Sequence, residues 1–130
     1  MQSKYWTVIA LSAIFLAMPV SAHHSHAQYD LTTWTPMEGT VKQVLWLNPH
    51  TWIYLEVNAA NGQAATWALE AAGPREIESN GVKREDVKPG DKIKVRCHLM
   101  TGNSKGCLLG YVTPNHGDAA RGQGVEKDWD

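Results

Sequence analysis

The chain has 130 residues, with 12 Lys plus Arg, 13 Asp plus Glu and a formal net charge of −1. This balance excludes a strongly basic domain that binds nucleic acid or anionic membranes mainly through charge. The length supports one domain with a single small hydrophobic core.

The first 22 residues have the pattern of a secretory signal peptide. Lys4 gives a positive start, residues 8–18 form an apolar stretch, and Val20-Ser21-Ala22 is a small-residue cleavage site. An uncleaved membrane anchor is the alternative, but the apolar stretch is shorter than the roughly 20 residues that span a bilayer. We therefore predict export to the periplasm, a mature chain that begins at His23, and no membrane span after cleavage.

After the signal, the sequence divides into a leader, a strand-rich region and a tail. Residues 23–36 are polar and rich in histidine, and residues 37–113 carry the strand patterns. Residues 114–130 are rich in glycine and charge, so we expect them to form a flexible tail.

Five segments of the central region have the pattern of β-strands. They cover residues 38–47, 51–57, 65–69, 92–100 and 108–113. The first changes phase at Gln43-Val44, which predicts a bulge or bend. Between the third and fourth, Pro74 and the stop signal Asn80-Gly81 predict one short helix. This order of elements predicts an all-β fold with one short helix, a small five-stranded OB-like Greek-key barrel. An open five-stranded sheet or a small sandwich is the alternative.

The two cysteines lie on either side of a turn-rich stretch. Cys97 and Cys107 flank residues 101–106, which separate two apolar runs, so a hairpin would bring the cysteines opposite each other. Thiols of an exported protein tend to pair. A thiolate metal site is the alternative, although the Cys-x-x-Cys spacing of common zinc sites is lacking. A cross-strand disulfide is therefore the favoured prediction.

A group of histidines is the sequence feature most able to carry chemistry. With cleavage after Ala22, His23 presents an α-amino group and an imidazole that can chelate one metal ion. His24 and His26 can add imidazoles, and His50 can approach if the leader folds back over the barrel. Imidazole suits copper, zinc and nickel, and Cu(II) heads the affinity order. Cleavage one residue earlier would place His24 third in the chain, which also favours Cu(II) or Ni(II).

Other roles are open for these and neighbouring side chains. An exposed histidine-rich leader can bind metals adventitiously, and His50 can simply hydrogen-bond its own turn. His98 and Met100 share the basic face of the fourth predicted strand, which we expect to be solvated. They resemble the ligands of small OB-fold copper carriers, but a second nearby methionine is lacking, so this candidate site is weaker.

Aromatic side chains give a second functional hypothesis. Trp46 and Trp52 flank Asn48-Pro49-His50 and could line a shallow groove that stacks flat ligands. In the alternative, these rings close the barrel end and pack beneath the leader. The sequence has no serine-hydrolase elbow, no His-Glu-x-x-His and no phosphate-binding glycine loop, so a non-enzymatic function is predicted.

Several segments resemble a family of small exported bacterial proteins of unknown function. The most specific are His23-His24-Ser25 after the signal and the stretch Trp46-Leu47-Asn48-Pro49-His50. The others are Tyr29-Asp30, Glu38-Gly39-Thr40-Val41, Trp67-Ala68-Leu69-Glu70 and Lys88-Pro89-Gly90-Asp91. The resemblance implies a periplasmic location and no established activity, and the cysteine pair is not part of the family pattern.

Two functional hypotheses follow, and neither involves nucleic acid. The first is a periplasmic barrel that binds copper, with zinc or nickel as alternatives, through His23, His24, His26 and His50. The second is a module that binds a small ligand or another periplasmic protein through Trp46, His50, Trp52 and Tyr54.

Overall fold

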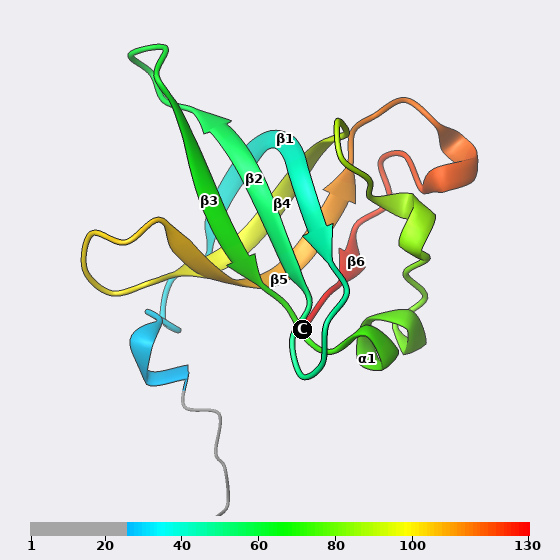
Figure 1. Ribbon diagram of the computed structural model, residues 1–130, viewed down its shortest axis with the longest axis horizontal. Helices are drawn as coiled ribbons and strands as arrows, with labels where there is room; N and C mark the ends of the chain where they lie inside the picture. Colours follow the sequence, from blue (N-terminus) through cyan, green and yellow to red (C-terminus); the bar gives the residue numbers. More distant parts are fainter. Residues whose placement is uncertain (1–25) are drawn as a thin grey trace, which may run out of the picture.

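The computed structural model describes residues 26–130, in which five strands close into a small barrel (Figure 1). They are β1 (Thr35–Leu45), β2 (Trp52–Asn58), β3 (Ala64–Glu70), β4 (Lys92–Leu99) and β5 (Gly106–Pro114). Antiparallel ladders join β3 to β2, β2 to β1, β1 to β4 and β4 to β5, and a parallel ladder between β3 and β5 closes the barrel. The structure therefore confirms the small closed barrel and rules out the open sheet.

One end of the barrel is covered by the segment between β3 and β4. It contains the predicted helix, α1 (Pro74–Ser79), and the single-turn 3-10 helix η2 (Arg84–Asp86). Pro74 occupies the first turn of α1, where its missing N–H costs nothing. Ile77 of α1 is fully buried in the core, and Val82 and Val87 pack beside it. This segment therefore completes the core at one open end of the barrel.

Strand β1 is bulged close to the position where the sequence pattern changes phase. Its register against β2 shifts between Val41 and Gln43, which makes Lys42 the extra residue. A bulge bends a strand and increases its twist, so β1 can pair with β4 along its first half and with β2 along its second. Gly39 allows the close approach, because a Cβ there would lie 2.3 Å from the carbonyl oxygen of Glu56.

The core side chains come from all five barrel strands. In β2, Ile53 and Leu55 are fully buried, as the alternation of the sequence predicts. Burying each such side chain contributes about 1.5–3 kcal/mol. The main strand contributors are Val41, Ile53, Leu55, Leu69, Ile93, Val95, Leu109 and Val112.

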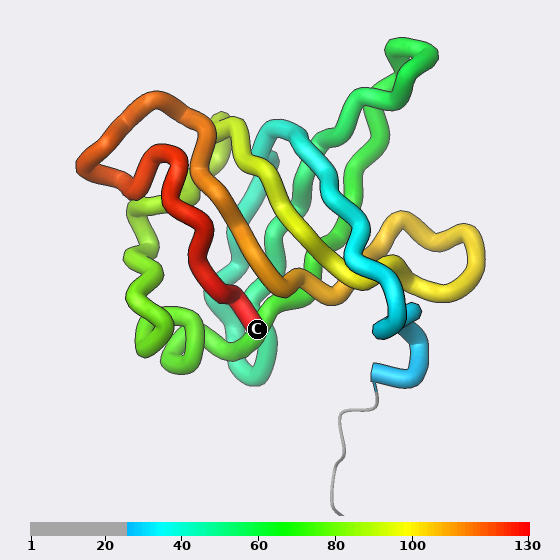
Figure 2. Tube along the Cα trace, turned by 180° about the vertical axis from the view of Figure 1, so that it is seen from behind, coloured from blue at the N-terminus to red at the C-terminus, as the bar shows by residue number. Residues whose placement is uncertain are grey.

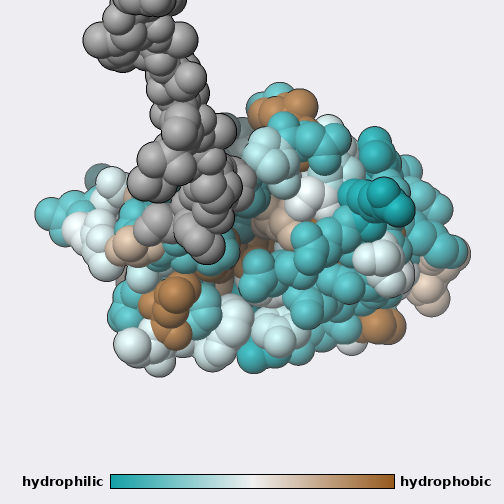
Figure 3. Space-filling view, turned by 90° about the horizontal axis from the view of Figure 1, so that it is seen from below, coloured by the Kyte–Doolittle hydropathy of each residue, from teal (hydrophilic) through white to brown (hydrophobic). Residues whose placement is uncertain are grey.

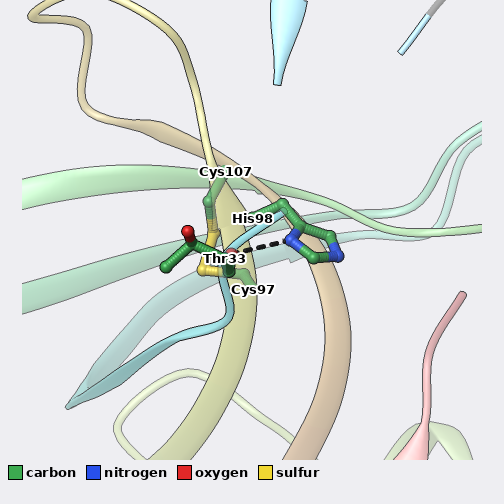
Figure 4. The surroundings of a disulfide bond; sticks show 4 residues. All are labelled: Thr33, Cys97, His98 and Cys107. Atoms are coloured by element: carbon green, nitrogen blue, oxygen red, sulfur yellow. Dashed lines mark hydrogen bonds between the residues drawn. A yellow bond between two sulfur atoms is a disulfide. The ribbon is translucent and has the colours of Figure 1, made fainter. Parts of the chain in front are cut away.

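Cys97 and Cys107 form a disulfide inside this core, which confirms the predicted bond (Figure 4). Their Cα atoms are 5.8 Å apart. The β4–β5 register pairs Cys107 with Leu99 and Cys97 with Leu109, so the two cysteines occupy diagonal rather than directly opposite positions. The bond ties β4 to β5 where both side chains are shielded from water.

The segment after β5 does not form the flexible tail that was expected at residues 114–130. It runs back beside β5 (Figure 2), through η3 (Ala119–Arg121) to β6 (Lys127–Asp128), which pairs with β5. Trp129 is only 1% exposed, and its backbone N–H donates to the Gly110 carbonyl oxygen at 2.8 Å. Burial of an indole removes about 150–250 Å² of surface from water. The resulting stabilisation outweighs the tendency of a glycine-rich, charged segment to stay flexible.

An ion pair holds β6 against the loop before β4. The Asp86 carboxylate accepts hydrogen bonds from Lys127 Nζ at 2.9 Å and from the Lys83 N–H at 3.0 Å. Burial alone would raise the pKa of Asp86, but these hydrogen bonds and the two lysine charges together lower that pKa below its ordinary value. Asp86 therefore stays ionised and keeps its bond to the C-terminal segment at neutral pH.

Candidate functional site

The described part of the leader packs against the β4–β5 hairpin. It begins with the 3-10 turn η1 (His26–Gln28), which is followed by Tyr29, a buried residue that bridges to Met100. Thr101 donates its N–H and its hydroxyl to the Gln28 carbonyl oxygen, at 2.8 and 3.1 Å. These contacts bring the leader back onto the barrel before the chain enters β1.

Tyr29 also links the leader to the end of β3. Its hydroxyl donates a hydrogen bond to Oε2 of Glu70, the last residue of that strand. Burial, the hydrogen bond to Glu70 and the negative charge of Glu70 together raise the pKa of Tyr29 to about 12. The phenol therefore remains protonated, and a donor, at neutral pH.

His50 approaches the same carboxylate from the loop between β1 and β2. Its Nδ1 lies 3.1 Å from the Ala71 carbonyl oxygen. Because a carbonyl can only accept, Nδ1 carries the hydrogen of this bond. Nε2 lies 3.6 Å from Glu70 Oε1, and the His50 and Glu70 side chains are only 22% and 12% exposed. The two carboxylate oxygens of Glu70 thus face different partners, Tyr29 and His50.

A cavity of about 320 Å³ lies beside His50, and both His26 and His50 line it. Its other lining residues are Pro49, Ala71, Ala72, Gly73, Glu76, Leu108 and Asp130. The walls therefore come from the leader, the β1–β2 loop, the segment between β3 and α1, and the C-terminal segment. Figure 3 views this end of the molecule, where the visible surface is mainly hydrophilic with separate hydrophobic patches.

The structure brings together two of the four predicted metal ligands. His26 and His50 share the cavity, whereas His23, His24 and the predicted signal peptide lie outside the described residues. Within residues 26–130, no group of three or more His, Cys, Asp or Glu side chains is placed to hold a metal ion. A metal site at His50 would therefore need donors beyond those that residues 26–130 supply.

The weaker candidate site, at His98 and Met100, is covered by the leader. His98 is only 9% exposed, which corrects the expectation that it lies on a solvated face. Its Nδ1 donates to the Thr33 carbonyl oxygen at 2.8 Å (Figure 4), and the Trp34 ring centroid lies 3.8 Å from that of its imidazole. Gly110 accommodates Trp34, because a Cβ there would lie 2.5 Å from the indole.

The aromatic residues of the second hypothesis lie in different environments. Trp46 packs against the core, with its ring centroid 5.5 Å from that of Trp129. Trp52 and Tyr54 belong to β2, and neither they nor Trp46 are among the described residues that line the cavity beside His50. Trp46 therefore packs against the core and the C-terminal segment.

Comparison with known proteins identifies a family but no activity. A model of a family of unknown function, DUF6152, matches residues 11–108. The chain belongs to this family. Searches of curated proteins and of solved structures gave no significant match. The DUF6152 match contains Tyr29, His50 and Glu70, so all three residues lie in the part of the chain that the family model covers.

A separate observation concerns membranes. No helix within the described range 26–130 is long and apolar enough to cross a bilayer.

Sequence reasoning missed Tyr29 and Glu70 as site residues. The alternation of β3 assigns Glu70 to the face opposite Leu69, where a charged side chain is usually solvated. The signal that was available lay in the family resemblance, because Tyr29-Asp30 and Trp67-Ala68-Leu69-Glu70 were among its segments. Their contact joins residues 41 positions apart, which no local pattern reports.

Proposed function

We propose that this DUF6152 protein is exported to the periplasm and binds a transition metal, copper above all, in a site that the leader and the barrel share. The proposed donors are His23, His24, His26 and His50. The observation that carries the proposal is the cavity that His26 and His50 line together. It supports a joint site because the leader returns to the loop that holds His50.

The chain between His23 and His26 is short enough for the remaining donors to lie near that cavity. An extended chain advances at most about 3.6 Å per residue, so the Cα of His23 lies no more than about 11 Å from that of His26. After cleavage behind Ala22, His23 would contribute an α-amino nitrogen as well as an imidazole. Two nitrogens from one residue and further imidazoles form a nitrogen-rich set, for which Cu(II) heads the divalent affinity order.

His50 has the geometry that metal-binding histidines commonly show. Such histidines donate one ring N–H to a backbone carbonyl or a carboxylate, which fixes the tautomer and turns the other nitrogen toward the ion. The Nδ1 bond from His50 to Ala71 has this form. It favours Nε2 of His50 as the donor atom, on the side where Glu70 lies.

Cu(II) affinity should depend on a free amino group at His23. We expect a Gly-Ser extension before His23 to weaken Cu(II) binding at least about tenfold, because a lost ligand should cost no less than a lost outer-shell partner. Every side chain is kept, so only the position of the amine changes. Isothermal titration of both forms measures the difference, and mass spectrometry of the exported protein identifies the native N-terminus.

The control for this experiment is His116→Ala, because the His116 ring bonds the Asp86 carbonyl oxygen and the Asp118 N–H rather than lining the cavity. Its Cu(II) affinity should equal that of the native form. Equal affinities of the native and extended proteins would exclude the amine as a donor. The absence of stoichiometric Cu(II) binding by the native form would overturn the proposed function.

A further inference from the structure

We infer that Glu70 is a ligand of the same metal ion, beside His50, and that the site takes a divalent ion such as Cu(II) rather than Cu(I). This inference rests on the proposed function. It adds a carboxylate from the end of β3 to a donor set that the sequence limited to histidines, and it assigns the oxidation state of the bound metal.

The distance between the two donor atoms suits one bridging ion. His50 Nε2 and Glu70 Oε1 are 3.6 Å apart. Metal bonds to imidazole nitrogen and carboxylate oxygen measure about 2.0–2.2 Å, so an ion bonded to both atoms would subtend an angle of roughly 120°.

Each of the two donor side chains also has a second hydrogen-bond partner. The His50 ring donates Nδ1–H to Ala71, and the Tyr29 hydroxyl donates to Glu70 Oε2, the oxygen that does not face His50. Ligating histidines and carboxylates are typically oriented by such outer hydrogen bonds. The residue that orients Glu70, Tyr29, belongs to the leader that also carries the other proposed donors. A salt bridge that only stabilised the fold would not need this third residue.

The chemistry of the donors selects the class of metal. Soft thiolate and thioether ligands favour Cu(I), whereas imidazole and carboxylate suit divalent ions. Cys97 and Cys107 are buried in their disulfide. Among the described residues that line the cavity there is no methionine and no cysteine. The set of His50, Glu70 and leader nitrogens therefore favours Cu(II), with Zn(II) as the next fit.

The test is a titration of the protein that begins at His23 with Cu(II), and separately with Cu(I) under reducing conditions. We expect Glu70→Gln to weaken Cu(II) binding at least about tenfold, since a direct ligand should matter no less than an outer-shell one. Cu(I) affinity should be weak in the wild type and change little in the variant. The Cu(II) EPR hyperfine splitting should also shift when the oxygen donor is lost.

Glu76→Gln is the control, because Glu76 lines the cavity beside His50 and the substitution removes the same charge as Glu70→Gln. It should leave the Cu(II) affinity and the EPR spectrum unchanged. Equal weakening by both substitutions would show that only the general negative charge matters, and would overturn ligation by Glu70.

Glu70→Asp keeps the charge but withdraws the carboxylate by one methylene, so it tests ligation if the glutamine variant folds poorly. It should also bind Cu(II) more weakly than wild type. If Cu(II) binds the wild type and the folded Glu70 variants equally, the His50–Glu70 contact is an ion pair only and the inference fails while the proposed function stands. If the wild type binds no Cu(II), the proposed function itself fails.

Discussion

Replacing Trp129 with alanine should destabilise the protein by about 3–5 kcal/mol, the usual cost of truncating a buried aromatic side chain. Trp129 is 1% exposed and packs against Trp46, although it directly follows the last strand, which has only two residues. The backbone hydrogen bonds of residue 129 to Gly110 and Ala72 remain in the variant, so the loss of stability measures the contribution of the indole ring. Urea unfolding of the oxidised protein measures the difference in free energy.

Trp34→Ala provides the comparison, because Trp34 is 43% exposed and lies on the outside of the barrel. It should cost clearly less than Trp129→Ala. A cost below about 1 kcal/mol for Trp129→Ala, the range of ordinary surface substitutions, would show that the C-terminal segment is not part of the core.

Removing the disulfide should cost about 3 kcal/mol. Cys97 and Cys107 are separated by 10 positions, and the chain-entropy model gives this magnitude for closing so short a loop in the unfolded state. The double variant Cys97→Ala/Cys107→Ala leaves no single buried thiol behind. Its free energy of unfolding, compared with that of the oxidised wild type, measures the contribution of the bond.

Reduction of the wild type supplies the control for this comparison. A reductant should destabilise the wild type by a similar amount and leave the double variant unaffected. Quantitative labelling of both thiols in unreduced, denatured protein would show that the bond does not form.

Local sequence signals were sufficient to predict the barrel. The alternation of β2 identified Ile53 and Leu55 as core residues, and the phase change at Gln43-Val44 marked the bulge that the register places at Lys42. Pro74 marked the start of α1. Each of these features is encoded by residues within a few positions of one another, so periodicity and turn chemistry suffice.

The covering of the barrel could not be predicted in the same way. Strand β6 has two residues, too few for any alternation, so nothing local marked Trp129 as a core residue. For His98, the alternation of β4 predicted the outer face but not the Trp34 ring that covers this face. What packs on an outer face depends on contacts between distant segments.

The candidate site was predicted in part for the same reason. The histidines were recognised from their side-chain chemistry, and His26 and His50 do line one cavity. Glu70 was missed because a carboxylate at a strand end is usually solvated. Only the fold shows that Tyr29 and His50 hold its two oxygens.

The central claim, that the leader and the barrel form one metal site, is tested most directly by hydrogen exchange on wild type and His50→Ala, each with and without Cu(II). Exchange in β2 serves as the internal control, because its core positions should be unaffected by metal. In the wild type, Cu(II) should slow exchange of the backbone amides of residues 24–28, and in His50→Ala this protection should be lost. Equal protection of these amides by Cu(II) in the two proteins would contradict the joint site.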